Sequence, residues 1–373
     1  MTDGTIGKIW LVRYGEIALK SPPVRKTWEA KLISNIQMVL PRSDSRREHG
    51  RIWLSGEVDP AMLARVFGIV SFSPCWTCDL KELKDTLLQY IAESFSAKKA
   101  TFGLRIRRIG HHQFTSQECA TQLGSAVLQC YPDFSVNLTN PDILIMIEIR
   151  ENRCYLFYQI FPGVGGIPLG VEGALVVLLS GGIDSAVAAW LMMKRGCRII
   201  PVFIDMTPLL GESARDRIHA VLDVLRRYQP DIDFHIIEDR YVAQIQETLR
   251  TSHDKKYVCL LCKRRMYRLA EKVARNLGAK GIVTGESMGQ VASQTLDNLA
   301  VLHEATTMPV YRPLIGLDKT EIIDLARRIG TYEPSILSSN CCGAVPQKPA
   351  TKADPGKIRK LEDRLASVIG YDM

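Results

Sequence analysis

Hydrophobic residues recur along the first 160 positions with two periods, about two residues for strands and about 3.6 for helices. Up to residue 76 the pattern predicts strand, helix, strand, helix and strand, an order typical of a small α+β domain of the split βαβ kind. The following stretch predicts helix, strand, helix and a hairpin. The expected elements are residues 7–14, 22–40, 51–54, 59–67 and 70–76, then 80–95, 101–109, 114–130, 142–150 and 154–160.

Beyond residue 170 the pattern changes to short apolar runs separated by helical segments. The runs at 175–179, 199–204, 234–237 and 281–284 read as buried strands. Strands that alternate with helices predict a parallel, doubly wound sheet with ligands at the carboxyl ends of its strands. The glycine-rich stretch 162–170 reads as a connection. We therefore expect three domains, at 1–72, 73–168 and 169–373.

Composition narrows the class of protein. The chain has 373 residues and 46% hydrophobic residues, enough for two or three domains with a core each. No apolar run reaches the roughly 18 residues of a membrane span, and the N-terminus is too polar for a signal peptide, so we expect no membrane contact and a cytoplasmic location. The net charge of +8 suggests an anionic partner. Ten cysteines with two Cys-x-x-Cys pairs indicate metal or sulfur chemistry rather than a disulfide framework.

The most informative motif is Ser180-Gly181-Gly182-Ile183-Asp184-Ser185, which follows an apolar strand and opens a helix. Backbone N–H groups at such a helix N-terminus can hold a phosphate. The spacing differs from G-x-x-x-x-G-K-[ST], which disfavours a kinase or GTPase of that type. The alternative is a glycine-rich turn without a ligand.

Two basic stretches suggest contacts with nucleic acid. Alternation places Arg105 and Arg107 on one face of a strand, next to Arg108, from which they could reach successive phosphates. Lys263 and Arg265 belong to a strongly basic helical segment at 255–275. Solvated charged faces are the alternative for both.

A further polar segment, 284–295, begins where the last predicted strand ends. Its glycines and its amides suit a loop that contacts a nucleotide or a nucleobase, because an amide both donates and accepts hydrogen bonds. The alternative is a polar loop that caps a helix. Cys75 and Cys78 lie at a strand end beside bulky residues. We expect both side chains to be buried in the core and to form no site.

Four segments together resemble one family. The 180–185 loop resembles that of the PP-loop ATP pyrophosphatases. With Arg13-Tyr14-Gly15-Glu16-Ile17-Ala18-Leu19-Lys20-Ser21, the segment Cys259-Leu260-Leu261-Cys262-Lys263-Arg264-Arg265-Met266 and the 284–295 segment, it is similar to the tRNA 4-thiouridine synthetase (ThiI) family over nearly the whole chain. The resemblance implies a ferredoxin-like domain at 1–72, a THUMP RNA-binding domain at 73–168 and a PP-loop ATP pyrophosphatase domain at 169–373.

The resemblance also implies a reaction. ATP with Mg²⁺ would adenylate O4 of uridine 8 in tRNA, pyrophosphate would leave, and sulfur would displace AMP to give 4-thiouridine. Asp184 would help to position Mg²⁺, and Arg105, Arg107, Arg108, Lys263 and Arg265 would contact tRNA. The ATP contacts carried over from the family are Leu178, Leu179, Ser180, Gly181, Gly182, Asp184, Ser185, Ile204, Asp205, Arg264, Gly285 and Gln294.

The cysteines of the chain bear on how sulfur would be delivered to the activated uridine. Family members that work by persulfide carry a C-terminal rhodanese domain, and this sequence ends at Met373 without one. The resemblance to rhodanese-lacking archaeal-type members implies an iron–sulfur cluster, [4Fe-4S] by expectation, held by Cys259, Cys262 and the catalytic Cys342, with Cys341 as the alternative third ligand. Zinc with four thiolates, a redox dithiol and a persulfide on Cys342 remain open. The donor would be sulfide or sulfur from a cysteine desulfurase.

Other functions remain to be weighed against this one. An amide-forming PP-loop ligase would not need a basic N-terminal half, and a non-catalytic RNA-binding protein would gain nothing from Asp184. The family is also linked to sulfur supply for the thiamine thiazole ring. Because family members are often dimers, we expect a homodimer.

Overall fold

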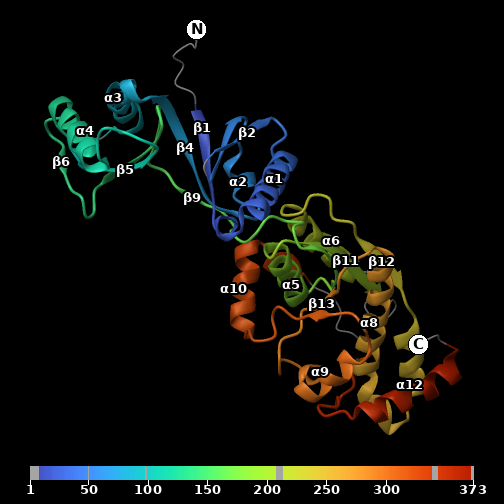
Figure 1. Cartoon of the computed structure of the whole chain (residues 1–373). Helices are drawn as coiled ribbons and strands as arrows, with labels where there is room; N and C mark the ends of the chain where they lie inside the picture. The colour runs from blue at the N-terminus through green and yellow to red at the C-terminus, as the bar shows by residue number, and fades with distance from the viewer. Residues whose placement is uncertain (1–7, 49, 97–98, 207–212, 338–342, 371–373) are drawn as a thin grey trace. The chain divides into compact units, whose positions relative to one another are not determined.

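The computed structural model describes residues 8–48, 50–96, 99–206, 213–337 and 343–370. The chain divides into two compact units, residues 1–165 and 166–373. Figure 1 shows both, the first in blue to green and the second in green to red. Within the described residues no helix is both long and apolar enough to cross a membrane.

The N-terminal unit is built on one continuous mixed sheet. Its described strands run in the order β2-β3-β1-β4-β8-β7-β5-β6, with β9 paired to β4. The long strand β4 (Ile69–Asp79) pairs with β1 (Lys8–Tyr14) along most of its length and with β8 (Arg153–Phe157) along its last four residues. The expected boundary between residues 72 and 73 therefore lies inside β4. The other strands are β2 (Ser43–Glu48), β3 (Arg51–Gly56), β5 (Thr101–Ile109), β6 (Ser135–Val136), β7 (Ile143–Arg150) and β9 (Phe161–Pro162).

Among the described residues, helices cover two hydrophobic cores along this sheet, and strand side chains such as Trp53 and Tyr155 form a third. Helices α1 (Pro22–Val39) and α2 (Pro60–Leu63) pack on β1, β3 and β4 through Leu32, Ile36 and Leu63. Helices α3 (Leu83–Ser94) and α4 (Ser116–Cys130) pack on β5, β7 and β8. Short 3-10 helices, η1 (Glu16–Leu19) and η2 (Leu80–Glu82), complete the unit. The predicted hairpin is present, because Arg150 pairs with Arg153 around a two-residue turn. Cys75 and Cys78 are buried, as expected.

The C-terminal unit contains the parallel sheet that the alternating pattern predicts. Among the described residues its order is β12-β11-β10-β13-β14, with every pairing parallel. The strands are β10 (Gly173–Leu178), β11 (Cys197–Asp205), β12 (His235–Glu238), β13 (Ile282–Val283) and β14 (Val310–Tyr311). From β10 the sheet grows first to one side and then, at β13, to the other. This reversal places the loops after β10 and β13 side by side at a topological switch point, where ligands bind in such sheets.

The helices of this unit position the site. Helix α5 (Ile183–Lys194) packs on β10, β11 and α10 (Lys319–Ile329). The others are α6 (Ser213–Arg226), α7 (Tyr241–Thr248), α8 (Val258–Asn276), α9 (Leu296–His303), α11 (Tyr332–Ser335) and α12 (Pro355–Ile369), with 3-10 helices η3 (His253–Tyr257) and η4 (Ala292–Gln294).

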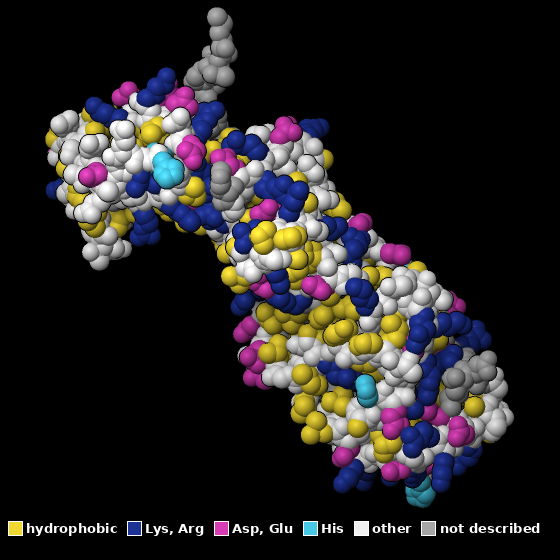
Figure 2. All heavy atoms as spheres, in the orientation of Figure 1, with side chains coloured by type: hydrophobic (Ala, Val, Ile, Leu, Met, Phe, Trp, Pro, Cys, Tyr) yellow, Lys and Arg dark blue, Asp and Glu magenta, His cyan; other side chains and the backbone are white. Residues whose placement is uncertain are grey.

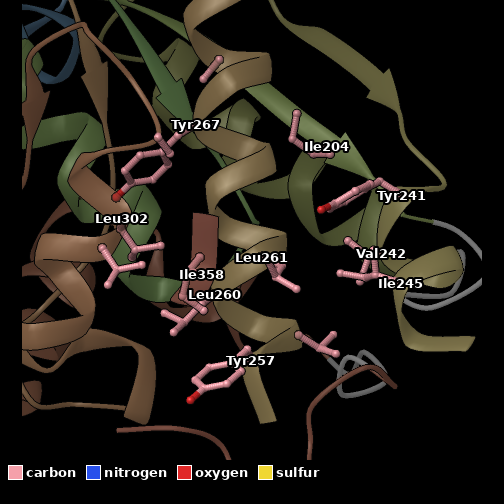
Figure 3. Packing of buried hydrophobic residues seen from close by; sticks show 14 of the residues in the cluster. Ile204, Tyr241, Val242, Ile245, Tyr257, Leu260, Leu261, Tyr267, Leu302 and Ile358 are labelled. Carbon is pink, nitrogen blue, oxygen red and sulfur yellow. The ribbon is translucent and has the colours of Figure 1, made fainter. Parts of the chain in front are cut away.

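Helix α8 passes through the centre of the largest hydrophobic core. Leu261 faces Val242 and Ile245 of α7, whereas Leu260 lies on the side toward Ile358 of α12 (Figure 3). Both leucines are at most 2% exposed. Burial of two such side chains on opposite sides contributes several kcal/mol, at about 1.5–3 kcal/mol each. The helix is therefore fixed in rotation, and so is the direction of its two cysteines.

Candidate functional site

The loop between β10 and α5 has the form of an anion-binding turn. Its two serines hold it closed: the Ser180 N–H donates to Ser185 Oγ over 3.2 Å, and Ser185 Oγ donates to the Gly182 carbonyl over 3.1 Å. The Gly182 N–H points back to Ser180 Oγ at 3.3 Å. Hydroxyl groups order this turn without a lysine, so an anion at the turn would be bound by backbone N–H groups at the start of α5.

Two glycines make the loop sterically feasible. Gly181 has φ +73°, and a Cβ on it would lie 2.8 Å from Cγ1 of Ile218. Gly285, at the end of β13, faces the backbone of the helix start, where a Cβ would lie 2.6 Å from both the Asp184 carbonyl carbon and the Ser185 nitrogen. A side chain at residue 285 would therefore displace the loop itself. The structure brings together Ser180, Gly181, Gly182, Asp184, Ser185 and Gly285 as the sequence predicts.

The carboxylate of Asp184 is held from two sides. Lys319 Nζ, in the first turn of α10, donates to Oδ1 over 2.5 Å, and Gln290 Nε2 donates to Oδ2 over 3.0 Å. The side chains of Asp184 and Lys319 are 24% and 43% exposed, so solvent still reaches them. Sequence reasoning missed Lys319. The local sequence offers only a weak signal, because a lysine in the first turn of a helix opposes the helix dipole.

A cavity of about 190 Å³ adjoins the loop. Four of the predicted nucleotide contacts line it, namely Leu178, Leu179, Ser180 and Ile204. Arg217 of α6, which the sequence did not single out, lines it as well. The cavity is mainly apolar at the strand ends and polar at the loop. This arrangement suits a base and ribose with phosphates at the loop.

Two other predicted ATP contacts are engaged in internal ion pairs. Asp205, at the end of β11, is 3% exposed and accepts hydrogen bonds from Nε and Nη2 of Arg215, the first over 2.8 Å. Arg264 is 2% exposed, binds both carboxylate oxygens of Glu362 over 2.8 Å and also donates to the Val301 carbonyl. Neither residue lines the cavity at the loop. Their contact with ATP stays a prediction.

The segment that follows β13 surrounds a buried carboxylate. Glu286 is 4% exposed and accepts hydrogen bonds from Lys263, Arg312, Tyr267 and Thr284. Although burial acts to raise its pKa, Lys263 and the other donors lower it below the ordinary value. This network of hydrogen bonds fixes the start of the 284–295 segment against α8 and Arg312. Gln294, the predicted amide contact, is buried, and its Oε1 accepts no hydrogen bond from the described residues.

The two cysteines of α8 face a second cavity. Its volume is about 440 Å³, and Cys259, Cys262, Lys263, Val291 and Ala344 are among the residues that line it. Ser180, Met206 and Met266 line both this cavity and the first one, so the two cavities adjoin at the loop. Cys262 Sγ lies 3.6 Å from Sδ of Met206. The structure thus brings the Cys-x-x-Cys pair next to the predicted phosphate loop.

The segment just after the predicted third cluster ligand borders the cysteine cavity. Cys342 and its alternative Cys341 lie outside the described residues. Ala344 and Val345, a few positions further on, line the cysteine cavity, and Gln246 Nε2 donates to the Gly343 carbonyl over 2.9 Å. In the part of the chain that is described, no three His, Cys, Asp or Glu side chains form a metal-binding group. Two thiols in an apolar cavity fit a cluster with at least one further ligand.

The predicted RNA contacts fall into two groups. Arg105 and Arg107 of β5 are exposed, and Arg108 is half-buried with Nε donating to Ser116 Oγ over 3.3 Å. Lys263 and Arg265 instead form internal ion pairs, Lys263 with Glu286 over 3.1 Å and Arg265 with Asp239 over 2.9 Å. On the face drawn in Figure 2, Lys and Arg side chains are spread over both units.

Comparison with known proteins covers nearly the whole chain. Residues 170–366 match the family described as thiamine biosynthesis protein (ThiI), residues 78–159 the THUMP domain, and residues 9–73 the ThiI ferredoxin-like domain. A probable tRNA sulfurtransferase of Methanothermobacter thermautotrophicus is 42% identical over 95% of this chain and 93% of its own. One from Methanocaldococcus jannaschii is 36% identical over 96% and 97%. The crystal structure of a 4-thiouridine synthetase–RNA complex with bound ATP is 34% identical, with TM-score 0.87, over 97% of this chain and 95% of the other.

Proposed function

Because this chain belongs to the ThiI family, we propose that it is an ATP-dependent tRNA sulfurtransferase, which adenylates uridine 8 of tRNA and replaces O4 with sulfur to give 4-thiouridine. One observation supports this most directly. The phosphate-loop cavity and the cysteine cavity adjoin at Ser180, Met206 and Met266. Activation by ATP at O4 and attack by sulfur at C4 must take place on the same carbonyl group of the uridine. Two adjoining cavities, one for each task, meet that requirement.

In the first half-reaction ATP would lie with its adenosine against Leu178, Leu179 and Ile204 and its phosphates at the 180–185 loop. Uridine O4 would attack the α-phosphorus while the bond to the pyrophosphate oxygen breaks. The N–H groups of the loop would stabilise the departing charge. Asp184 offers the carboxylate oxygens that Mg²⁺ prefers, and Lys319 keeps that side chain oriented. A bound Mg²⁺ would add charge neutralisation at the phosphates.

In the second half-reaction sulfur would attack the activated carbon and AMP would leave. Cys259 and Cys262 lie on the cavity wall with their direction fixed by the packing of α8. We propose that they hold an iron–sulfur cluster together with Cys342. The cluster would supply an iron site for a sulfur atom that comes from sulfide or from a cysteine desulfurase. The apolar wall formed by Val242, Val258 and Val291 would exclude water from the reacting atoms.

The N-terminal unit would bind the RNA. Arg105 and Arg107 present two exposed guanidinium groups at alternate positions on one face of β5. Guanidinium groups bind phosphate oxygens in a bidentate manner. Such a contact depends on the position of the RNA backbone and not on the base sequence of the RNA. Lys263 and Arg265 are less suitable, because Glu286 and Asp239 already neutralise them. We also propose that two copies of the chain act as a homodimer.

The decisive experiment is nucleoside mass spectrometry of unmodified tRNA after anaerobic incubation with the protein, ATP, Mg²⁺ and sulfide. We expect 4-thiouridine at position 8 that depends on ATP, and its loss in Asp184→Asn. Asp324→Asn, on the exposed face of α10, is the matched control and should retain full activity. AMP and pyrophosphate without any thiolated nucleoside, from protein of verified iron content, would contradict the proposal and favour an amide-forming ligase.

A further inference from the structure

Arg217 of α6 occupies a special place beside the phosphate loop. Its Nη2 lies 3.5 Å from the Ser180 carbonyl oxygen. Its Nε lies 3.3 Å from the position that a Cβ on Gly181 would take. The side chain also lines the cavity shared by Leu178, Leu179 and Ile204. The guanidinium group therefore lies beside the loop glycine and forms part of the cavity wall.

The electrostatic setting favours an anion at this point. Burial lowers the pKa of the Arg217 guanidinium group, since the cavity removes part of its hydration. A phosphate bound at the loop would form hydrogen bonds with the Arg217 guanidinium group and so replace part of the interaction with water that burial removes. The planar guanidinium group would then act beside the backbone N–H groups of the loop, and the two kinds of donor could bind different oxygens of one phosphate chain.

We propose that Arg217 binds the β- and γ-phosphates of ATP at the 180–185 loop and holds the pyrophosphate as it leaves. The inference rests on the proposed function and adds a residue to its first step. As the bond from uridine O4 to the α-phosphorus forms, the α–β bridging bond breaks and its electron pair stays with pyrophosphate. Arg217 lies where that negative charge increases. Leu178 and Ile204, on the apolar wall of the same cavity, would hold the adenosine end, to which Arg217 would contribute much less than to the phosphates.

The experiment compares three ligands on the intact protein with Mg²⁺: ATP, inorganic pyrophosphate and AMP, each by isothermal titration calorimetry. We expect Arg217→Gln to raise the Kd of ATP and of pyrophosphate by about 10- to 100-fold, the range for loss of a charge-assisted hydrogen bond. The Kd of AMP should rise by less than about twofold. Arg217→Lys retains the charge and should recover part of the loss. Arg226→Gln, on the same helix and in an exposed ion pair with Asp223, should bind all three ligands as wild type does.

Each result decides the matter. Equal loss for AMP and ATP would mean that Arg217 supports the fold of the cavity, and unchanged affinity for pyrophosphate would mean that it does not touch the phosphates; either overturns the proposal. Thermal unfolding of each variant, together with Arg217→Lys, separates a folding defect from a binding defect. Because the titrations need neither tRNA nor sulfur, they remain informative if 4-thiouridine is not formed. In that case the proposed function fails while the assignment of Arg217 stands or falls separately.

Discussion

At the scale of single residues, Asp184 is the point where the loop, the 284–295 segment and α10 meet. Its carboxylate is bound by Gln290 from the segment and by Lys319 from the helix. Two donors on one carboxylate orient it without closing it to solvent, because about a quarter of the side chain remains exposed. An oriented, accessible carboxylate can exchange one partner for a cation that arrives with ATP.

Replacement of Lys319 by methionine tests that role. We expect Lys319→Met to lower the rate of tRNA-dependent AMP formation by about 100-fold, because an Asp184 carboxylate that Lys319 no longer orients would misplace the cation it binds, and a misplacement of about 1 Å can cost that much. The measurement is AMP release under saturating ATP, with 4-thiouridine yield measured in parallel. Arg328→Gln, exposed on the same helix, is the control. Activity of Lys319→Met within about threefold of wild type would leave Lys319 with a structural role only.

At the scale of elements, regular patterns were predictable and exceptions to them were not. The β-α alternation after residue 170 predicted the parallel sheet correctly, because buried parallel strands are apolar throughout. Strand β2 was missed because Ser43–Glu48 is polar; it is an edge strand held by its backbone ladder with β3. Strand β4 (Ile69–Asp79) extends past the expected end at residue 76, because its last residues continue into the ladder with β8, a long-range pairing that a local pattern does not show.

The same distinction holds within the site. The loop at 180–185 was predictable since its residues are contiguous and their chemistry is local. Lys319 and Arg217 come from helices far along the chain, and only the packing of α10 and α6 brings them to the loop. Lys263 shows what a charge pattern leaves out: its basic neighbours predicted a contact with tRNA, and the pattern gave no sign that its side chain pairs with Glu286; the contact with tRNA stays a prediction.

One interaction between elements predicts a pH effect on stability. Glu271 of α8 accepts hydrogen bonds from Thr306 and Thr307 and pairs with Arg275. Burial acts to raise the pKa of Glu271, but these groups outweigh it and lower that pKa from 4.5 to about 2. A lowered pKa in the folded state means that the carboxylate stabilises the fold above pH 4.5. This contribution decreases as the pH falls toward 2.

The variant Glu271→Gln should therefore have a lower Tm than wild type at pH 7, and the difference should shrink between about pH 4.5 and pH 2. Differential scanning fluorimetry over pH 2.5 to 7 measures it. Glu304→Gln, whose side chain is 35% exposed in its pair with Arg359, provides the comparison and should show little dependence on pH. A Tm difference that stays constant down to pH 2.5 would show that the Glu271 charge contributes nothing.

At the scale of the whole molecule, the proposed function would separate the binding of RNA, by the N-terminal unit, from the chemistry, in the C-terminal unit. The N-terminal unit contains the exposed arginines of β5, and the C-terminal unit contains both cavities. Contacts to RNA phosphates are electrostatic and release bound counterions, so they weaken steeply with salt. Contacts of ATP with the loop would involve far fewer phosphates, so they would depend less on salt. Changes in one unit should accordingly leave the binding function of the other intact.

This separation can be measured with two double variants of β5. Reversal of charge in Arg105→Glu/Arg107→Glu should weaken tRNA binding and reduce the slope of log K against log salt by about two, because each arginine would no longer neutralise one phosphate. Arg105→Lys/Arg107→Lys preserves both charges and should preserve the slope. ATP affinity should be the same in both variants, because the nucleotide cavity is built from residues of the other unit. An unchanged salt slope after charge reversal would remove these arginines from the RNA-binding surface, whereas a loss of ATP affinity would show that the two units do not bind independently.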